Sequence, residues 1–153
     1  MTKMPELVSL FNGFGGASAA LIGLVEFSRN VQDTLQAITI VSGIVIGAIT
    51  FSGSLVAWGK LNGSLKSVVK IPQYNLINNL FFIGIIALAV FMVVTGNHNP
   101  LFTYGVLAAG LLYGVLFVLP IGGADMPVVI SLLNSLTGIA AAITGILYDN
   151  MVM

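Results

Sequence analysis

The stretch that decides the fold covers residues 81–90 and reads Phe81-Phe82-Ile83-Gly84-Ile85-Ile86-Ala87-Leu88-Ala89-Val90. A strand of a membrane β-barrel alternates apolar and polar residues with a period of two, because its two faces meet lipid and lumen. This run carries no charge and shows no alternation, so it predicts a helix rather than a strand. A helix that is apolar on all sides is typical of a membrane span.

The composition of the whole chain supports the same interpretation. The 153 residues are 58% apolar and only 7% charged, whereas a soluble domain carries about 25% charged residues to solvate its surface. A soluble domain and a disordered chain are both excluded. The formal net charge is zero, so we expect no nucleic-acid partner. The chain has no cysteine, which excludes a disulfide framework and leaves the redox compartment open.

The apolar residues fall into five stretches long enough to cross a bilayer, which takes about 20 residues each. Polar or Pro/Gly-containing breaks separate them. The predicted spans cover residues 7–27, 35–58, 76–95, 101–119 and 127–148. We therefore predict a single all-α transmembrane bundle of about five spans over residues 1–153, without a soluble domain. The N-terminal run also resembles a signal peptide, but its hydrophobicity continues beyond Ala19, so we expect no cleavage.

The positive charges predict the orientation of the bundle. With five spans, the N-terminus and the 59–75 and 120–126 loops share one side of the membrane. The lysines on that side are Lys3, Lys60, Lys66 and Lys70. The other side carries only Arg29. Short loops rich in Lys and Arg stay in the cytoplasm or the matrix, so we expect both loops there.

Small residues recur at helical spacing in several spans, and membrane helices associate through such residues. Packing between helices is the interpretation that we favour for the glycines. The candidate packing residues are Gly16, Gly43, Gly47, Gly110, Gly114 and Gly138. The third span has few small residues beyond its own Gly84, Ala87 and Ala89, so we expect it to be the most lipid-exposed helix.

Two amides fall inside predicted spans at a similar depth. Asn12 lies about one turn inside the first span, and Asn134 about two turns inside the fifth, counted from the same side. An amide in the membrane needs a partner or water, so both could line one polar pathway. Hydrogen bonding that only holds the helices together is an equally open alternative.

Asp125 is the only acid in the 120–126 loop. It lies two residues before Pro127, where it could cap the fifth helix. The alternative is a carboxylate at the mouth of a proton path, whose charge would respond to a docked partner.

The sequence offers no catalytic, cofactor-binding or metal-binding residues. It contains neither a P-loop nor a dinucleotide-binding fingerprint. One histidine and no cysteine cannot build a metal cluster. Any activity must therefore be transport, or must reside in a partner.

Three motifs occur in order along almost the whole chain. They are Met4-Pro5-Glu6-Leu7-Val8, then Gly47-Ala48-Ile49-Thr50-Phe51-Ser52-Gly53-Ser54 followed by Trp58-Gly59-Lys60-Leu61, and Ile121-Gly122-Gly123-Ala124-Asp125-Met126-Pro127-Val128-Val129-Ile130-Ser131-Leu132-Leu133-Asn134-Ser135. In these motifs the chain resembles the membrane domain of the beta subunit of proton-translocating NAD(P) transhydrogenase.

The resemblance implies a function in coupling hydride transfer between NADH and NADP⁺ to proton movement across a bacterial or mitochondrial inner membrane. It implies a proton pathway past Asn12, Ser54 and Asn134, with Asp125 coupling it to the NADP(H)-binding domain. It also implies an alpha subunit and that NADP(H)-binding domain as partners, in a homodimeric complex. NAD and NADP would bind in partner domains, so this chain would bind no cofactor and would not transfer hydride by itself.

The chain departs from the family pattern in two respects. Many members have a relay histidine where this chain has Asn12, and an amide cannot exchange a proton near neutral pH. The group that replaces the histidine stays open. The family's beta subunit also has further spans and a soluble nucleotide domain, so we expect a fragment or a split version of it. The alternative is a stand-alone, small oligomeric transporter or channel.

Overall fold

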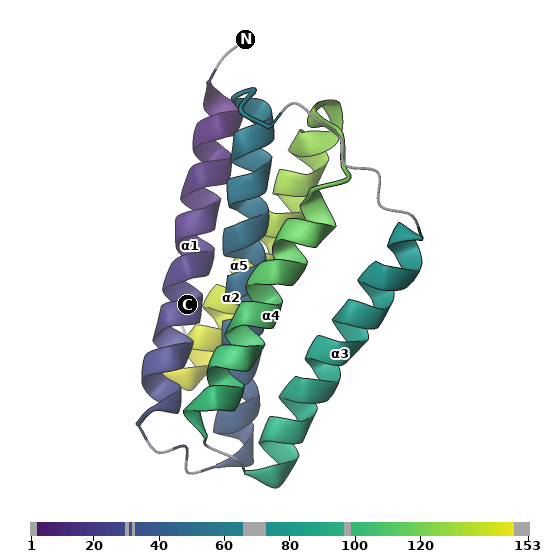
Figure 1. Cartoon of the computed structure of the whole chain (residues 1–153). Helices are drawn as coiled ribbons and strands as arrows, with labels where there is room; N and C mark the ends of the chain where they lie inside the picture. Colours follow the sequence, from purple (N-terminus) through teal and green to yellow (C-terminus); the bar gives the residue numbers. More distant parts are fainter. Residues whose placement is uncertain (1–2, 30, 32, 66–72, 97–98, 149–153) are drawn as a thin grey trace.

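Five long helices make up the computed structural model, which describes residues 3–29, 31, 33–65, 73–96 and 99–148 (Figure 1). The helices are α1 (Met4–Phe27), α2 (Thr34–Leu61), α3 (Tyr74–Thr95), α4 (Pro100–Val118) and α5 (Met126–Leu147), with the short 3-10 helix η1 (Gly123–Asp125) before α5. The all-α prediction is confirmed. The predicted spans differ from the helices most at the start of α1 and the end of α2. Lys66 and Lys70 lie outside the described residues.

Local sequence signals explain where several helices begin and end. Pro100 opens α4, and the side chain of Asn99 accepts a hydrogen bond from the backbone N–H of Leu101 at 3.0 Å. This cap satisfies one of the donors that a helix start leaves unpaired. α3 ends at Thr95, and the residue that follows, Gly96, has a φ of 58° in the left-handed region that glycine adopts without steric cost.

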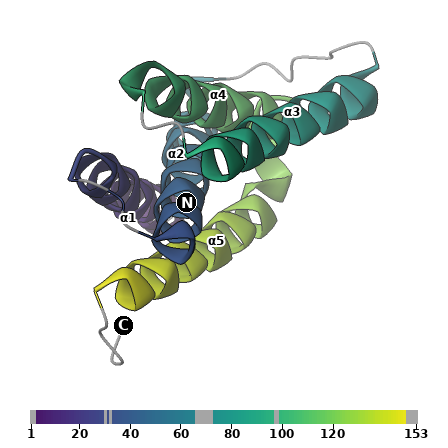
Figure 2. The ribbon, with the colours of Figure 1, turned by 90° about the horizontal axis from the view of Figure 1, so that it is seen from below.

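The helix α2 lies at the centre of the bundle. Figure 2 shows α1, α4 and α5 arranged around it, with α3 on the outside. The side chains of Ile40, Ile44 and Ala57 on α2 are almost completely buried. On α3 only Ile85 and Met92 are buried, which is the smallest buried share of the five helices. That this helix meets lipid stays a prediction. All five helices are long and apolar enough to cross a membrane.

Glycines bring α1 and α2 into backbone contact. A Cβ atom at Gly47 would lie 2.6 Å from the carbonyl oxygen of Gly16 and 2.7 Å from the amide nitrogen of Ala20. Both neighbours are backbone atoms of a helix, so they cannot move aside as a flexible side chain would. The two helices can therefore pack this closely only because position 47 has no side chain.

The other candidate packing glycines differ in their surroundings. A Cβ at Gly110 would lie 2.9 Å from the Cβ of Ala48, and one at Gly114 would overlap the carbonyl oxygen of Ile49. These two glycines bring α4 against α2. A Cβ at Gly43 or at Gly138 would meet no atom within 4 Å among the described residues. The structure thus places neither of these two in a close helix contact.

Replacing Gly47 tests the backbone contact. We expect Gly47→Ala to lower the free energy of unfolding by roughly 1–3 kcal/mol, the usual cost of overpacking a tight interior. The measurement is unfolding of the purified chain in mixed detergent micelles, followed by circular dichroism. The matched control is Gly84→Ala on α3, where a Cβ meets nothing within 4 Å. It should leave the stability unchanged or raise it by up to about 1 kcal/mol. Equal effects of the two substitutions would contradict the packing argument.

Candidate functional site

A cluster of polar side chains lies inside the bundle where α1, α2 and α5 meet. We call Ser9, Asn12, Ser54 and Thr137 the polar cluster. The side-chain amide of Asn12 donates to Oγ of Ser54 at 3.0 Å, and its Oδ1 accepts from Oγ1 of Thr137 at 2.8 Å. Oγ of Ser9 donates to the backbone carbonyl of Ser54 at 2.8 Å. Asn12 is 7% exposed, and Ser9 and Ser54 are completely buried. The cluster therefore joins three helices through satisfied hydrogen bonds.

Glycines beside Asn12 let the two other helices come close enough for these bonds. A Cβ at Gly13 would lie 3.2 Å from the Cβ of Ser54, and one at Gly15 would lie 2.9 Å from Cγ2 of Thr137. Gly13 lies on the side of α1 that packs against α2, and Gly15 lies on the side that packs against α5. α1 therefore contacts both helices closely. The local sequence around Asn12 thus positions α2 on one side of the amide and α5 on the other.

The chemistry of the polar cluster is that of neutral donors and acceptors. None of its members gains or loses a proton near neutral pH. The side chain of Asn12 donates one hydrogen bond to Ser54 and accepts another from Thr137. A neutral imidazole also has one donor and one acceptor. The hydrogen bonds of Asn12 therefore need one donor and one acceptor, and neither has to be charged.

Asn134 lies apart from the polar cluster. It is exposed on α5, together with Ser131, Ser135 and Gly138. These four residues form one stripe, which we call the outer face of α5. The sequence suggested that Asn12 and Asn134 could line one path, but the α5 residue that contacts Asn12 is Thr137.

Sequence reasoning missed two members of the polar cluster. Ser9 precedes Asn12 by three residues and shares one side of α1 with it. Thr137 follows Asn134 by three residues, but Thr137 faces Asn12 whereas Asn134 is exposed. This spacing was the available signal. It could not decide which residue of α5 turns inward, because Asn134, Ser135 and Thr137 are all polar.

Asp125 is exposed at the last residue of η1, immediately before α5. It occupies the N-cap position of α5, but its side chain makes no capping hydrogen bond. The residue that follows it, Met126, is completely buried. The carboxylate is therefore held at the surface by a neighbour that is anchored in the core, and it remains available to a partner.

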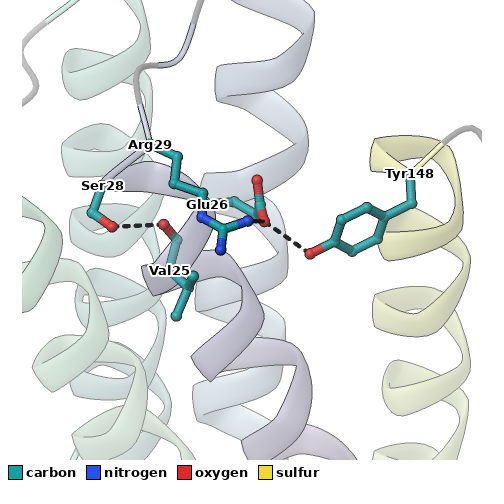
Figure 3. A network of polar contacts seen from close by, with 5 residues as sticks. All are labelled: Val25, Glu26, Ser28, Arg29 and Tyr148. Atoms are coloured by element: carbon teal, nitrogen blue, oxygen red, sulfur yellow. Dashed lines mark hydrogen bonds and ion pairs between the residues drawn. The ribbon is translucent and has the colours of Figure 1, made fainter.

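At the opposite end of the bundle, a carboxylate connects the ends of α1 and α5 (Figure 3). The hydroxyl of Tyr148 donates to Oε1 of Glu26 at 2.9 Å, and Arg29 contacts the same oxygen at 3.3 Å. The hydrogen bond to Glu26 raises the pKa of Tyr148, because the carboxylate holds the phenolic proton. Among the described residues, no three acidic or histidine side chains gather as metal ligands would.

Comparison with known proteins adds a family to this geometry. Residues 1–153 match the sequence profile of the NAD(P) transhydrogenase beta subunit family. The chain is 37% identical over 160 aligned residues to NAD(P) transhydrogenase subunit beta of Rhodospirillum rubrum, and equally to the same subunit from a named strain of that species. Each alignment covers 98% of this chain and 34% of the relative. The chain thus spans about a third of the length of the curated relatives it matches.

The bond between Asn12 and Ser54 can be measured with a double-mutant cycle. We expect Asn12→Ala and Ser54→Ala to show a coupling energy of about 1 kcal/mol in the free energy of unfolding, typical of hydrogen bonds between membrane helices. The control cycle pairs Ser54→Ala with Ser18→Ala, because Ser18 is exposed and its hydroxyl donates to the carbonyl of Phe14 within α1. That pair should couple by less than about 0.5 kcal/mol. Additive effects of Asn12→Ala and Ser54→Ala on the free energy of unfolding would contradict a stabilising hydrogen bond between the two side chains.

Proposed function

Because the chain belongs to the NAD(P) transhydrogenase beta subunit family, we propose that its five helices form part of a proton-translocating membrane domain. In this proposal, hydride passes between NADH and NADP⁺ in partner domains, and the chain itself binds neither nucleotide. The membrane is a bacterial or mitochondrial inner membrane. The end of the bundle that carries Lys60 and Asp125 faces the cytoplasm or the matrix, where short loops with lysines stay.

The observation that carries this proposal is the polar cluster. A polar side chain inside a membrane bundle is costly unless it is paired, and such residues often mark the path of an ion. Asn12, Ser54 and Thr137 supply amide and hydroxyl groups from three helices at one level of the bundle. Hydroxyl and amide groups can hydrogen-bond to a chain of water molecules, so this level is suited to pass a proton along water.

The outer face of α5 is the second region that we assign to the proton path, because it carries Asn134. An unpaired amide in contact with lipid costs several kcal/mol, so Asn134 is unfavourable on a surface that meets only lipid. We place another helix of the assembled complex against this face, from the alpha subunit or from the rest of the beta subunit. That helix would also supply the titratable relay that Asn12 does not provide.

Asp125 is proposed to sense the NADP(H)-binding domain. Its exposed carboxylate lies at the end of the bundle where that domain would dock. A nucleotide-dependent contact can change the state of a channel only if the two states differ in their contacts with the partner. A carboxylate at the boundary provides such a difference, because the approach of a charged or apolar partner changes its interaction free energy.

Removing the charge of Asp125 tests its role in coupling. In the assembled enzyme in liposomes, we expect Asp125→Asn to lower the number of protons translocated per hydride by at least about fivefold, the lower range of allosteric coupling. The control is Asp33→Asn, which makes the same change on an exposed carboxylate at the opposite end of the bundle. An unchanged number of protons per hydride in Asp125→Asn would refute the coupling role of Asp125.

Asn134 is tested in the same preparation. Asn134→Leu removes the amide from the outer face of α5, and we expect proton flux to fall by at least about tenfold if one water-binding group is essential. The matched control is Asn79→Leu, an exposed amide on α3. If the chain alone forms oligomers and conducts protons in vesicles, and Asn134→Leu stops this flux, the outer face instead mediates self-association. That result would favour a stand-alone transporter or channel.

A further inference from the structure

A buried lysine connects α2 to the segment that leads from α4 to α5. Lys60 is 8% exposed, and its ammonium donates to the backbone carbonyl of Val118 at 3.1 Å. It also donates to the carbonyls of Leu119 and Ile121. Among the described residues, no carboxylate lies within ion-pair distance of this ammonium. The charge is therefore held by backbone dipoles alone.

The three carbonyls belong to the end of α4 and to the residues just beyond it. The last turn of a helix leaves its carbonyls without intrahelical partners, and the helix dipole makes this end partly negative. An ammonium has three N–H donors, and here each has an acceptor. Lys60 thus caps α4 from a neighbouring helix, and it keeps the chain beyond α4 close to α2.

The chain beyond α4 carries Asp125. Lys60 binds it on one side, at Ile121, and Met126 anchors it on the other. Met126 is completely buried in a core cluster that includes Val56 and Ala57 of α2. The segment from Ile121 to Met126 is therefore attached to the same end of α2 by a polar contact before Asp125 and an apolar contact after it.

The helix α2 also carries Ser54 of the polar cluster. Ser54 precedes Lys60 by six residues, which is about 9 Å along the helix axis. A rigid helix of this length moves as one body, so a shift of α2 at Ser54 displaces the carbonyls that Lys60 holds.

We propose that Lys60 is a positioning residue that attaches the Asp125 segment to α2 and thereby links Asp125 to the polar cluster. The attachment stands on the contacts of Lys60 alone. The link to proton translocation rests on the proposed function above, so the two parts need separate measurements.

The attachment is tested with a spin label in the Asp125 segment. The chain has no cysteine of its own, so Ala124→Cys gives one labelling site in lipid nanodiscs. We expect Lys60→Met to raise the mobility of the label about threefold, as local attachment is lost. Lys3→Met removes the same charge from an exposed position at the same end and should leave the mobility unchanged. Unchanged mobility in Lys60→Met would overturn the attachment. If Lys60→Met does not fold, Lys60→Gln gives the same test.

The link to coupling is tested in the assembled enzyme in liposomes. We expect Lys60→Met to lower the protons translocated per hydride by about threefold, within the range for residues on a coupling element. This ratio does not depend on how much enzyme folds. A normal ratio in Lys60→Met, together with a lowered ratio in Asp125→Asn, would overturn the link. A normal ratio in Asp125→Asn would instead refute the proposed function, and the label mobility would still decide the attachment.

Discussion

The structure depends on how closely its other helices approach α2. Lipid offers little hydrophobic gain for helix association, so packing and hydrogen bonds must hold the bundle together. At Gly16 and Gly47 the backbones of α1 and α2 are in contact, with no room for a side chain. Gly110 and Gly114 bring α4 equally close on another side. The central helix can therefore carry buried polar groups, because α1 and the end of α4 are near enough to pair with them.

Two sets of polar groups in this bundle differ in their surroundings. Those at the junction of α1, α2 and α5 are buried and hydrogen-bonded, and Lys60 is satisfied by the carbonyls at the end of α4. Those on the outer face of α5 are exposed in the single chain. The first group has its hydrogen-bonding partners within the chain, whereas the second group lies on the surface of the chain. Asn134 belongs to the second group and Asn12 to the first.

Much of the fold could be predicted, because a bilayer imposes one length and one polarity on each span. The apolar run around Gly84 was enough to exclude a barrel, and breaks that contain proline and glycine separated the predicted spans. The site was harder. Asn12 and Ser54 were singled out, and they form a hydrogen bond. Ser9, Thr137 and the contacts of Lys60 were missed, because they depend on how each helix is rotated about its axis.

By itself, the sequence determined the number of helices, their approximate ends and the membrane environment. These properties follow from local hydropathy and turn residues, which act within one segment. Only the tertiary structure decided that α2 is central, that Thr137 rather than Asn134 meets Asn12, and that Lys60 holds the end of α4. These outcomes depend on contacts between segments up to 125 residues apart. The rotation and approach of each helix are set by all of its neighbours at once, so no single segment encodes them.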